Sequence, residues 1–333
     1  MEGEERRGAA AAIGWEQRAS VRAVQTLADR AAACARDVAA AHGEIVSLTR
    51  FPTGLCHVVF DVVLAGGARL VVRVGTPETR HLVAGAVAWS HVLRPAGVPL
   101  PELLGHDVDA PLPYVVLERL PGQDLGLVFD ELSVEQRRTV ARSVAQVQLL
   151  VGRTGPGDGY GYSADPGGRP PQPSWAGVLR ENLQRSGARL QRASADVRRL
   201  HEQVLHRAED LRNELAAVPP TPFLDDTTTK NVLVDGGRCT GVVDVDVVCF
   251  GDPLLAPALT EVSLVAADRP TDYVHTWLAA SGAAQGPLLD LYRAVFCLDL
   301  LSEAGLVFNR DEPVVVDAAR VERLTGLAAA VLA

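Results

Sequence analysis

Three side chains near residues 226–244 have the types and the spacing to hold a divalent metal. Asp226 and Asn231 precede a β-branched apolar run, and Asp244 follows the returning apolar run. The hairpin would span residues 232–243, with Asp-Gly-Gly at its turn. Because a hairpin brings its two ends together, we expect the two carboxylates and the amide oxygen to converge. Oxygen ligands of this kind suit Mg²⁺ that also binds the phosphate oxygens of a nucleotide.

The residues around this hairpin also match a family pattern. The chain has LDDTTTKN followed by GVVDVDVVCFGDP, and this resembles HGDLHPGN followed by GVIDWGDAGVGDP of the aminoglycoside phosphotransferase family, whose enzymes are protein-kinase-like. The resemblance covers roughly residues 45–310. It implies that Asp226 is the catalytic carboxylate facing an acceptor hydroxyl, and that Asn231 and Asp244 hold the metal ions that bridge the nucleotide phosphates. The alternative is a solvated Asp-rich turn beside an ordinary hairpin.

Lys230 is a second candidate catalytic residue in this loop. It lies four residues beyond Asp226, close enough to neutralise charge on a phosphoryl group in transfer. A plain solvated lysine is the alternative. The chain departs from the family pattern at three places, where Leu224, Ala86 and Ala256 replace a His, a Glu and an Asp.

The residues before this region predict an antiparallel sheet. Apolar runs at 45–48, 58–64 and 70–74 are separated by turn residues. The resemblance places the Gly54 loop over the nucleotide phosphates and makes Arg73, within the third run, a phosphate contact. An ordinary turn and an outward-facing strand arginine are the alternatives.

The segment at 112–122 resembles the family's hinge. The resemblance implies that backbone groups of Glu118 and Leu120 bind adenine. Because backbone recognition leaves no side-chain signature, the sequence does not distinguish ATP from GTP as the nucleotide. Beyond the hinge the apolar spacing is mostly helical. The expected helices of the whole chain are 17–41, 79–93, 133–151, 175–186, 193–217, 257–267, 270–281, 288–309 and 315–331.

These elements predict an α+β chain with the bilobal protein-kinase-like fold. Residues 1–15 would be a disordered tail, 16–120 an antiparallel-sheet lobe that binds the nucleotide, and 121–333 a mostly helical lobe with the catalytic loop and the acceptor site. A length of 333 residues favours two lobes over one, and 47% hydrophobic residues suffice for two cores.

Composition excludes several classes of protein. The net charge of −9 argues against a nucleic-acid partner, because there is no basic stripe to meet phosphates. No apolar run reaches membrane-spanning length, and the N-terminus lacks the pattern of a signal peptide. The five cysteines show no metal-ligand spacing and are expected to be reduced thiols of a cytoplasmic protein.

The predicted reaction is transfer of the γ-phosphoryl group of ATP or GTP, with Mg²⁺, to a hydroxyl of a small molecule, plausibly an antibiotic or a natural-product intermediate. A pseudokinase that binds nucleotide without transfer is the alternative, and the oligomeric state is left open. A cationic acceptor would be attracted by acids that the chain places near the cleft. The candidates are Asp225, Asp246, Glu261, Asp299 and Glu303.

Overall fold

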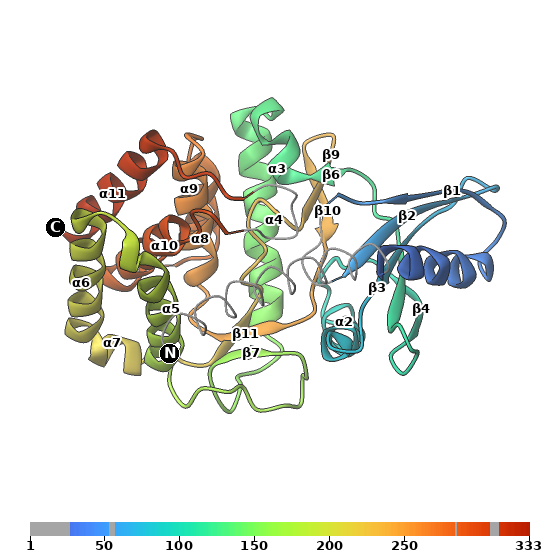
Figure 1. Ribbon diagram of the computed structural model, residues 1–333, viewed down its shortest axis with the longest axis horizontal. Helices are drawn as coiled ribbons and strands as arrows, with labels where there is room; N and C mark the ends of the chain where they lie inside the picture. Colours follow the sequence, from blue (N-terminus) through green and yellow to red (C-terminus); the bar gives the residue numbers. More distant parts are fainter. Residues whose placement is uncertain (1–26, 53–56, 284, 307–312) are drawn as a thin grey trace, which may run out of the picture. The chain divides into compact units, whose positions relative to one another are not determined.

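The computed structural model describes residues 27–52, 57–283, 285–306 and 313–333. The predictions for the tail at 1–15, for a helix over 17–26 and for the Gly54 loop lie outside these ranges. The chain divides into two compact units (Figure 1). The first comprises Met1–Val83 and Leu103–Arg119, and the second comprises Ala84–Glu102 and Leu120–Ala333.

The first unit is built on a five-stranded antiparallel sheet. Its order is β1-β2-β3-β5-β4. The predicted meander over 45–74 is therefore confirmed, whereas the fourth strand in chain order, formed by the mixed segment LLGHD, was not predicted. The strands are β1 (Ile45–Arg50), β2 (Val58–Leu64), β3 (Arg69–Val74), β4 (Leu103–Asp107) and β5 (Tyr114–Glu118).

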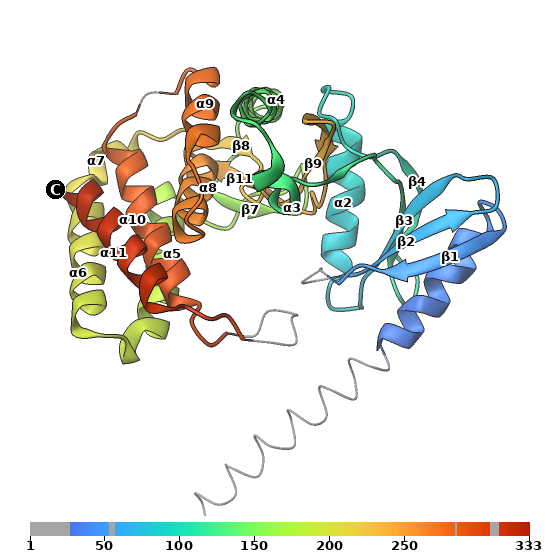
Figure 2. The same ribbon diagram turned by 90° about the horizontal axis from the view of Figure 1, so that it is seen from above.

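A helix over residues 27–40 covers one face of this sheet (Figure 2). Ala31, Ala35 and Ala39 recur at a spacing of four and are fully buried. They pack with Phe60, Val72 and other apolar residues of β2 and β3 in the core of this unit. Small alanine side chains let the helix lie close to the strands.

The second unit is mostly helical and contains the larger core. The C-terminal part of α2 belongs to it, and α4 packs along α9 within it (Figure 1). Its predicted helix at 133–151 begins with the expected capping box, in which Ser133 and Gln136 satisfy each other's backbone N–H groups. The helices are α2 (Arg80–Leu93), α3 (Leu125–Val128), α4 (Val134–Gly152), α5 (Trp175–Arg189), α6 (Ala195–Asp210), α7 (Arg212–Ala216), α8 (Leu255–Ala266), α9 (Asp272–Ala280), α10 (Pro287–Ser302) and α11 (Ala318–Leu332).

Two of the helix predictions were too long. The expected helix at 193–217 ends at Asp210, because Leu211 leaves the helical conformation with ψ of 17°, and a short helix follows it. The helix expected to reach residue 309 ends at Ser302, and Gly305 takes the left-handed conformation with φ of 78°. Among the described helices, none combines the length and the apolar character that crossing a bilayer requires.

The second unit also contains two small antiparallel sheets of three strands each. One has the order β10-β9-β6 and the other β7-β11-β8. The predicted hairpin is confirmed as β9 and β10, and its turn residues Gly236 and Gly237 both have positive φ, as a tight hairpin turn requires. The strands are β6 (Gln123–Asp124), β7 (Gly161–Ser163), β8 (Thr221–Phe223), β9 (Val232–Asp235), β10 (Arg238–Val242) and β11 (Val248–Gly251).

The Gly-Asp-Pro segment at the end of β11 is fixed by a buried chain of hydrogen bonds. Trp175 Nε1 donates to the Tyr292 hydroxyl over 2.8 Å, and this hydroxyl donates to Asp252 Oδ2 over 2.8 Å. A side chain at Gly251 would collide with the Trp175 ring, since its Cβ would lie 2.1 Å from a ring carbon. The glycine thus allows the indole to reach the hydroxyl that holds Asp252.

Replacing Tyr292 by Phe tests this chain of hydrogen bonds. We expect the free energy of unfolding to fall by about 1–3 kcal/mol, because Trp175 and Asp252 each lose a buried partner. The control is Tyr273→Phe, since the buried Tyr273 hydroxyl has no hydrogen-bond partner among the described residues. Urea unfolding should show no loss for that variant. Equal losses in the two variants would contradict the prediction.

Candidate active site

The two ends of the hairpin meet as predicted. The Val243 N–H donates to the Asn231 carbonyl over 2.9 Å, one step beyond the paired residues Val232 and Val242. This bond places Asn231 beside the residue that precedes Asp244. The hairpin ladder therefore fixes the separation of two of the three predicted side chains.

Asp226 joins this pair through a direct side-chain contact. Asn231 Nδ2 donates to Asp226 Oδ2 over 2.8 Å and to the Asp226 carbonyl over 3.2 Å. Asp226 and Asp244 are both exposed, and Asn231 is half-buried. The structure thus brings Asp226, Asn231 and Asp244 together at one solvent-accessible point of the second unit.

Backbone strain is concentrated at the same point. Asn231 has φ of 63° and Asp244 has φ of 65°. Among the described non-glycine residues, only Asp268, just after α8, shares the left-handed conformation. Such a conformation costs an L-residue about 1–2 kcal/mol, less for Asn and Asp than for other residues, and it is often found at functional sites. The surrounding structure therefore helps to hold the two predicted metal ligands in this conformation.

The charges around Asp226 act in opposite directions on its acidity. Although the residue is exposed, the protein groups packed around its carboxylate partly desolvate it and so raise the pKa of Asp226, Lys230 lowers this pKa, and the neighbouring Asp244 raises it. Lys230 is the only lysine of the chain, although the chain has 32 basic residues of the Lys and Arg types. Its ammonium group is exposed and lies within electrostatic reach of the Asp226 carboxylate.

The donor set fits a hard divalent cation. Among the described residues, the hydrogen bonds of the Asn231 carboxamide are both made by Nδ2, so Oδ1 can face a ligand. Asp244 adds an exposed carboxylate. An amide oxygen and a carboxylate beside a second acid are ligands that Mg²⁺ accepts, with water and phosphate oxygens completing its coordination.

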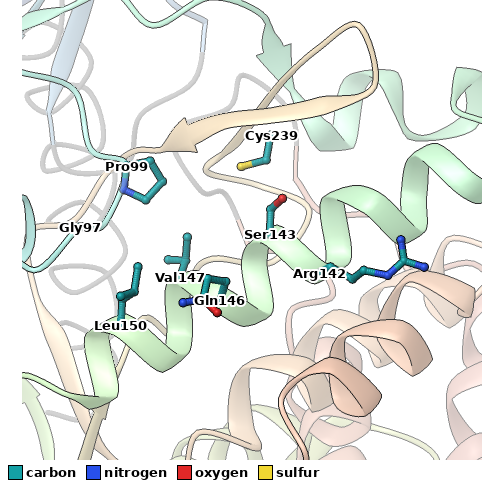
Figure 3. A pocket seen from close by; sticks show the side chains of 8 residues that line it. All are labelled: Gly97, Pro99, Arg142, Ser143, Gln146, Val147, Leu150 and Cys239. Carbon is teal, nitrogen blue, oxygen red and sulfur yellow. The ribbon is translucent and has the colours of Figure 1, made fainter.

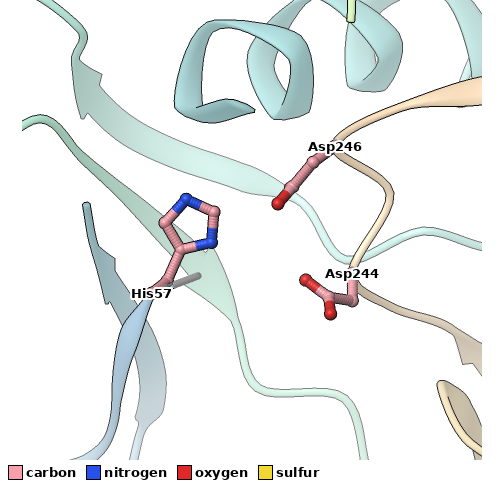
Figure 4. A group of neighbouring side chains, drawn as sticks. All are labelled: His57, Asp244 and Asp246. Carbon is pink, nitrogen blue, oxygen red and sulfur yellow. The ribbon is translucent and has the colours of Figure 1, made fainter. Parts of the chain in front are cut away.

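Asp246 lies on the same loop as Asp244, two residues beyond it (Figure 4). Its side chain is buried, and its backbone carbonyl packs directly against α2. A Cβ on Gly85 of that helix would lie 2.1 Å from this carbonyl oxygen. The helix therefore needs a residue without a side chain next to Ala86, the position of the family's Glu.

The missing family histidine at Leu224 is compensated by Gln148. Gln148 Nε2 donates to the Leu224 carbonyl over 2.7 Å, and the Leu224 N–H donates to Gln148 Oε1 over 3.0 Å. Both residues are buried. The amide of Gln148 on α4 thus holds the backbone two residues before Asp226, while the Leu224 side chain packs in the core.

Asp225 has an environment distinct from that of its neighbour. Its carboxyl group contacts the hydroxyl of Tyr162 on β7, whose ring is 46% exposed. Burial, together with the charge of Asp226, raises the pKa of Asp225 to about 6. The chain therefore carries a carboxyl group that titrates near neutrality directly beside the predicted catalytic Asp226.

The three helical acids predicted to face an acceptor differ in their contacts. Asp299 accepts a hydrogen bond from Ser186 over 2.8 Å and lies 3.5 Å from Arg185. Burial raises the pKa of Glu303 and so does Asp299, whereas Lys230 is among the cations that lower it. Glu303 is therefore electrostatically linked to the catalytic loop.

Glu261 is held by a different partner. Arg293 donates two hydrogen bonds to its carboxylate, over 2.6 and 2.9 Å, and both side chains are buried between α8 and α10. This ion pair uses the carboxylate in helix packing. A role of Glu261 toward an acceptor stays a prediction.

In the first unit, Arg73 is buried in β3 and does not point outward into solvent. Its Nη2 lies 2.9 Å from Nδ1 of His57, which is also buried. A guanidinium group only donates, so Nδ1 accepts and the neutral ring carries its proton on Nε2. His57, drawn in Figure 4, is a partner of Arg73 that the family pattern did not indicate.

The hinge residues lie at the end of β5. Glu118 is the last residue of that strand, paired with Leu70 of β3. Leu120 begins the longer segment of the second unit, where its side chain approaches Gly241 of β10. Backbone recognition of adenine by these two residues stays a prediction.

A groove of about 440 Å³ lies elsewhere in the second unit, between α4, β10 and the segment at 97–99 (Figure 3). The thiol of Cys239 faces it, and burial raises the pKa of that thiol. None of its lining residues belongs to the predicted site. They are Gly97, Pro99, Arg142, Ser143, Gln146, Val147, Leu150 and Cys239.

Sequence reasoning missed three residues that support the site. Gln148 is 76 residues from Leu224, and Asp124 is 107 residues from Asn231, whose backbone N–H it accepts over 3.0 Å. His57 lies 16 residues before Arg73 in the sequence. The only available signal was a polar residue within an apolar helical face for Gln148. Asp124 and His57 gave no local signal.

Replacing Gln148 by Leu tests the support of the catalytic loop. We expect a loss of about 2–5 kcal/mol in the free energy of unfolding, because the Leu224 N–H and carbonyl both lose a buried partner. Gln146, exposed on the same helix, provides the control variant Gln146→Leu, expected to stay within about 0.5 kcal/mol of wild type. Urea unfolding measures both. A small effect of Gln148→Leu would show that the loop does not depend on the amide.

Replacing Asp225 by Asn tests its raised pKa. Below about pH 3 the Asp225 carboxyl is protonated in both the folded and the unfolded chain. As the pH rises to about 6, the unfolded chain releases this proton more readily, so wild type loses stability. Asp225→Asn should therefore become more stable than wild type across this range, by up to about 3 kcal/mol.

Urea unfolding from pH 4 to pH 8 measures this difference. The control is Asp210→Asn, at the exposed end of α6. Its stability relative to wild type should not follow the same curve. A constant difference for Asp225→Asn across the whole pH range would refute the raised pKa.

Comparisons with known proteins identify the family of this chain. The model of the phosphotransferase enzyme family, APH, matches residues 47–295. A crystal structure of a thermostable mutant of aminoglycoside phosphotransferase APH(4)-Ia, in ternary complex with ADP and hygromycin B, is 20% identical. The alignment with that structure covers 89% of this chain and 97% of that chain, with a TM-score of 0.62.

Two further solved structures have the same fold. Macrolide 2'-phosphotransferase MphH from Brachybacterium faecium is 18% identical, covering 82% of this chain and 91% of that chain, with a TM-score of 0.57. ADP-bound aminoglycoside phosphotransferase APH(2'')-Ib is 12% identical, covering 86% and 95%, also with a TM-score of 0.57. No curated protein matches. The family match, the shared bilobal kinase-like fold and the convergence of Asp226, Asn231 and Asp244 lead to one conclusion: this chain belongs to the phosphotransferase enzyme family and is a small-molecule phosphotransferase.

Proposed function

We propose that this chain transfers the γ-phosphoryl group of ATP to a hydroxyl group of a small molecule. The observation that carries the proposal is the contact of Asp226 with Asn231, beside Asp244 at the end of the hairpin opposite its turn. This arrangement offers a base and two oxygen ligands at one exposed point. Phosphoryl transfer needs mainly positioning and charge stabilisation, and these residues supply both.

Asp226 would orient the acceptor hydroxyl and accept its proton. Partial desolvation and Asp244 raise the pKa of Asp226, which makes the carboxylate a stronger base, whereas Lys230 lowers this pKa. The Asn231 amide fixes one carboxylate oxygen over 2.8 Å, so the other is available to the hydroxyl. Lys230 would stabilise negative charge on the phosphoryl group during transfer.

Asn231 Oδ1 and the Asp244 carboxylate would hold Mg²⁺. When bound, the ion would neutralise the phosphate oxygens and orient the γ-phosphoryl group. Both ligands have left-handed backbones and lie at the end of the hairpin opposite its turn, where Asn231 contacts Asp226.

The nucleotide would be ATP, because two of the similar structures are bound to ADP, and nothing in the comparisons favours GTP. In the first unit, Arg73 stays the proposed phosphate contact, oriented by His57. Gly54 stays a proposed phosphate contact, and backbone groups of Glu118 and Leu120 stay the proposed adenine contacts.

The acceptor is proposed to be a hydroxyl-bearing antibiotic or natural-product intermediate. Similar structures include a hygromycin B complex and a macrolide 2'-phosphotransferase, and this supports acceptors of that size and polarity. Asp225 beside Asp226, and Glu303 near Lys230, offer carboxylates to a cationic group of the acceptor.

The second candidate is a pseudokinase that binds nucleotide without transfer. It is favoured by the replacements at Leu224, Ala86 and Ala256. One of these sites has a substitute for the missing support: Gln148 holds the Leu224 backbone. This contact supports the active enzyme.

The experiment is a transfer assay with labelled ATP against aminoglycosides, macrolides, peptide antibiotics and amino alcohols. We expect one class to be phosphorylated, and Asp226→Asn to lower kcat by about 100- to 10,000-fold, because the hydroxyl loses its base. Asp235→Asn in the hairpin makes the same chemical change outside the site and should keep full activity. Nucleotide binding without transfer to any acceptor would favour the pseudokinase.

A further inference from the structure

We propose that Asp124 is a positioning residue of the phosphotransfer site, holding the backbone of Asn231 in the conformation that aims its carboxamide at Asp226. The inference rests on the proposed function for its effect on metal binding. Its effect on the loop is independent of that function.

The Asp124 carboxylate connects two separate elements. Its Oδ2 accepts the backbone N–H of Asn231 over 3.0 Å, and its Oδ1 accepts the backbone N–H of Gly126 over 2.9 Å. The second bond caps the first turn of α3. One half-buried side chain thus ties the segment after the hinge to the catalytic loop.

Two further contacts make this connection rigid. The Gly126 N–H also donates to the Thr229 carbonyl over 2.7 Å, so the loop is held on both sides of Lys230. Asp124 itself pairs with Leu233 through the β6–β9 ladder. The carboxylate is therefore fixed relative to the strand that follows Asn231, and it has little freedom to follow a displaced loop.

The positive φ of Asn231 gives this bond its importance. At φ of 63° an L-residue is unfavourable, and rotation to an ordinary conformation would turn its N–H away from Asp124. The same rotation would move the side chain, which donates to Asp226 over 2.8 Å. The bond from Asp124 therefore stabilises the one backbone conformation in which Asn231 can contact Asp226.

A merely structural role as a helix cap is the competing explanation. The substitution Asp124→Ser distinguishes this role from the proposed positioning role. Serine is a good capping residue but has a single side-chain oxygen, so Asp124→Ser can cap α3 and still loses the second acceptor. The matched control is Asp317→Ser. Asp317 caps α11 by accepting the Arg320 N–H over 2.7 Å, and among the described residues it has no hydrogen bond or ion pair with the segment 224–235.

The first measurement is amide hydrogen exchange of the segment 224–235 in the protein without nucleotide. We expect exchange of the Asn231 amide to quicken by about tenfold or more in Asp124→Ser, because its acceptor is gone. Asp317→Ser should leave this segment unchanged. Unchanged exchange in Asp124→Ser overturns the proposal, whatever the protein's activity.

The second measurement is Mn²⁺ binding in the presence of ADP, followed by electron paramagnetic resonance of the free ion. We expect Asp124→Ser to weaken Mn²⁺ binding by about tenfold or more, and Asp317→Ser to match wild type. Faster exchange with unchanged Mn²⁺ affinity also overturns the proposal, since the loop would then not position a metal ligand. Failure of wild type to bind Mn²⁺ with ADP would count against the proposed function instead, and the exchange result would still decide the role of Asp124 toward the loop.

Discussion

The hydrogen bond from the Val243 N–H to the Asn231 carbonyl is the contact on which the rest of the site depends. It extends the hairpin ladder by one step beyond its strands. Asn231, which precedes β9, and Asp244, which follows β10, both have left-handed backbones there. Without it, the ladder would end at Val232 and Val242, and the strain in Asn231 and Asp244 would relax into ordinary loop conformations. The site is therefore built from local backbone geometry first, and side-chain chemistry depends on that geometry.

The departures from the family pattern show which parts of such a site can change. The histidine before the proposed catalytic Asp226 is replaced by Leu224, and the backbone it would support is held by Gln148. The helix position of the family's Glu is occupied by Ala86. At the neighbouring Gly85, the Asp246 carbonyl leaves no room for a side chain. A supporting residue can thus be exchanged for one on another element, because a backbone N–H or carbonyl accepts any well-placed partner. A base or a metal ligand cannot be exchanged in this way.

The sequence predicted what local patterns determine. The hairpin followed from β-branched residues around Asp-Gly-Gly, and the capped helix at 133–151 followed from Ser133 and Gln136. The supports from Asp124 and Gln148 could not be predicted, because residues 107 and 76 positions apart meet only in the folded chain. The same limit explains Glu261. On the sequence it was one acid among several, and only the fold shows that buried Arg293 accounts for its charge.

The balance of charge explains why this point on the second unit should bind cations. Asp124, Asp226 and Asp244 act on one another and on Lys230, the single lysine of the chain. Burial raises the pKa of Asp124 and of Asp226, so the folded chain holds carboxylates that are less stable as anions than in water. A divalent cation would add positive charge beside these carboxylates, so its binding would lower the free energy of the folded state.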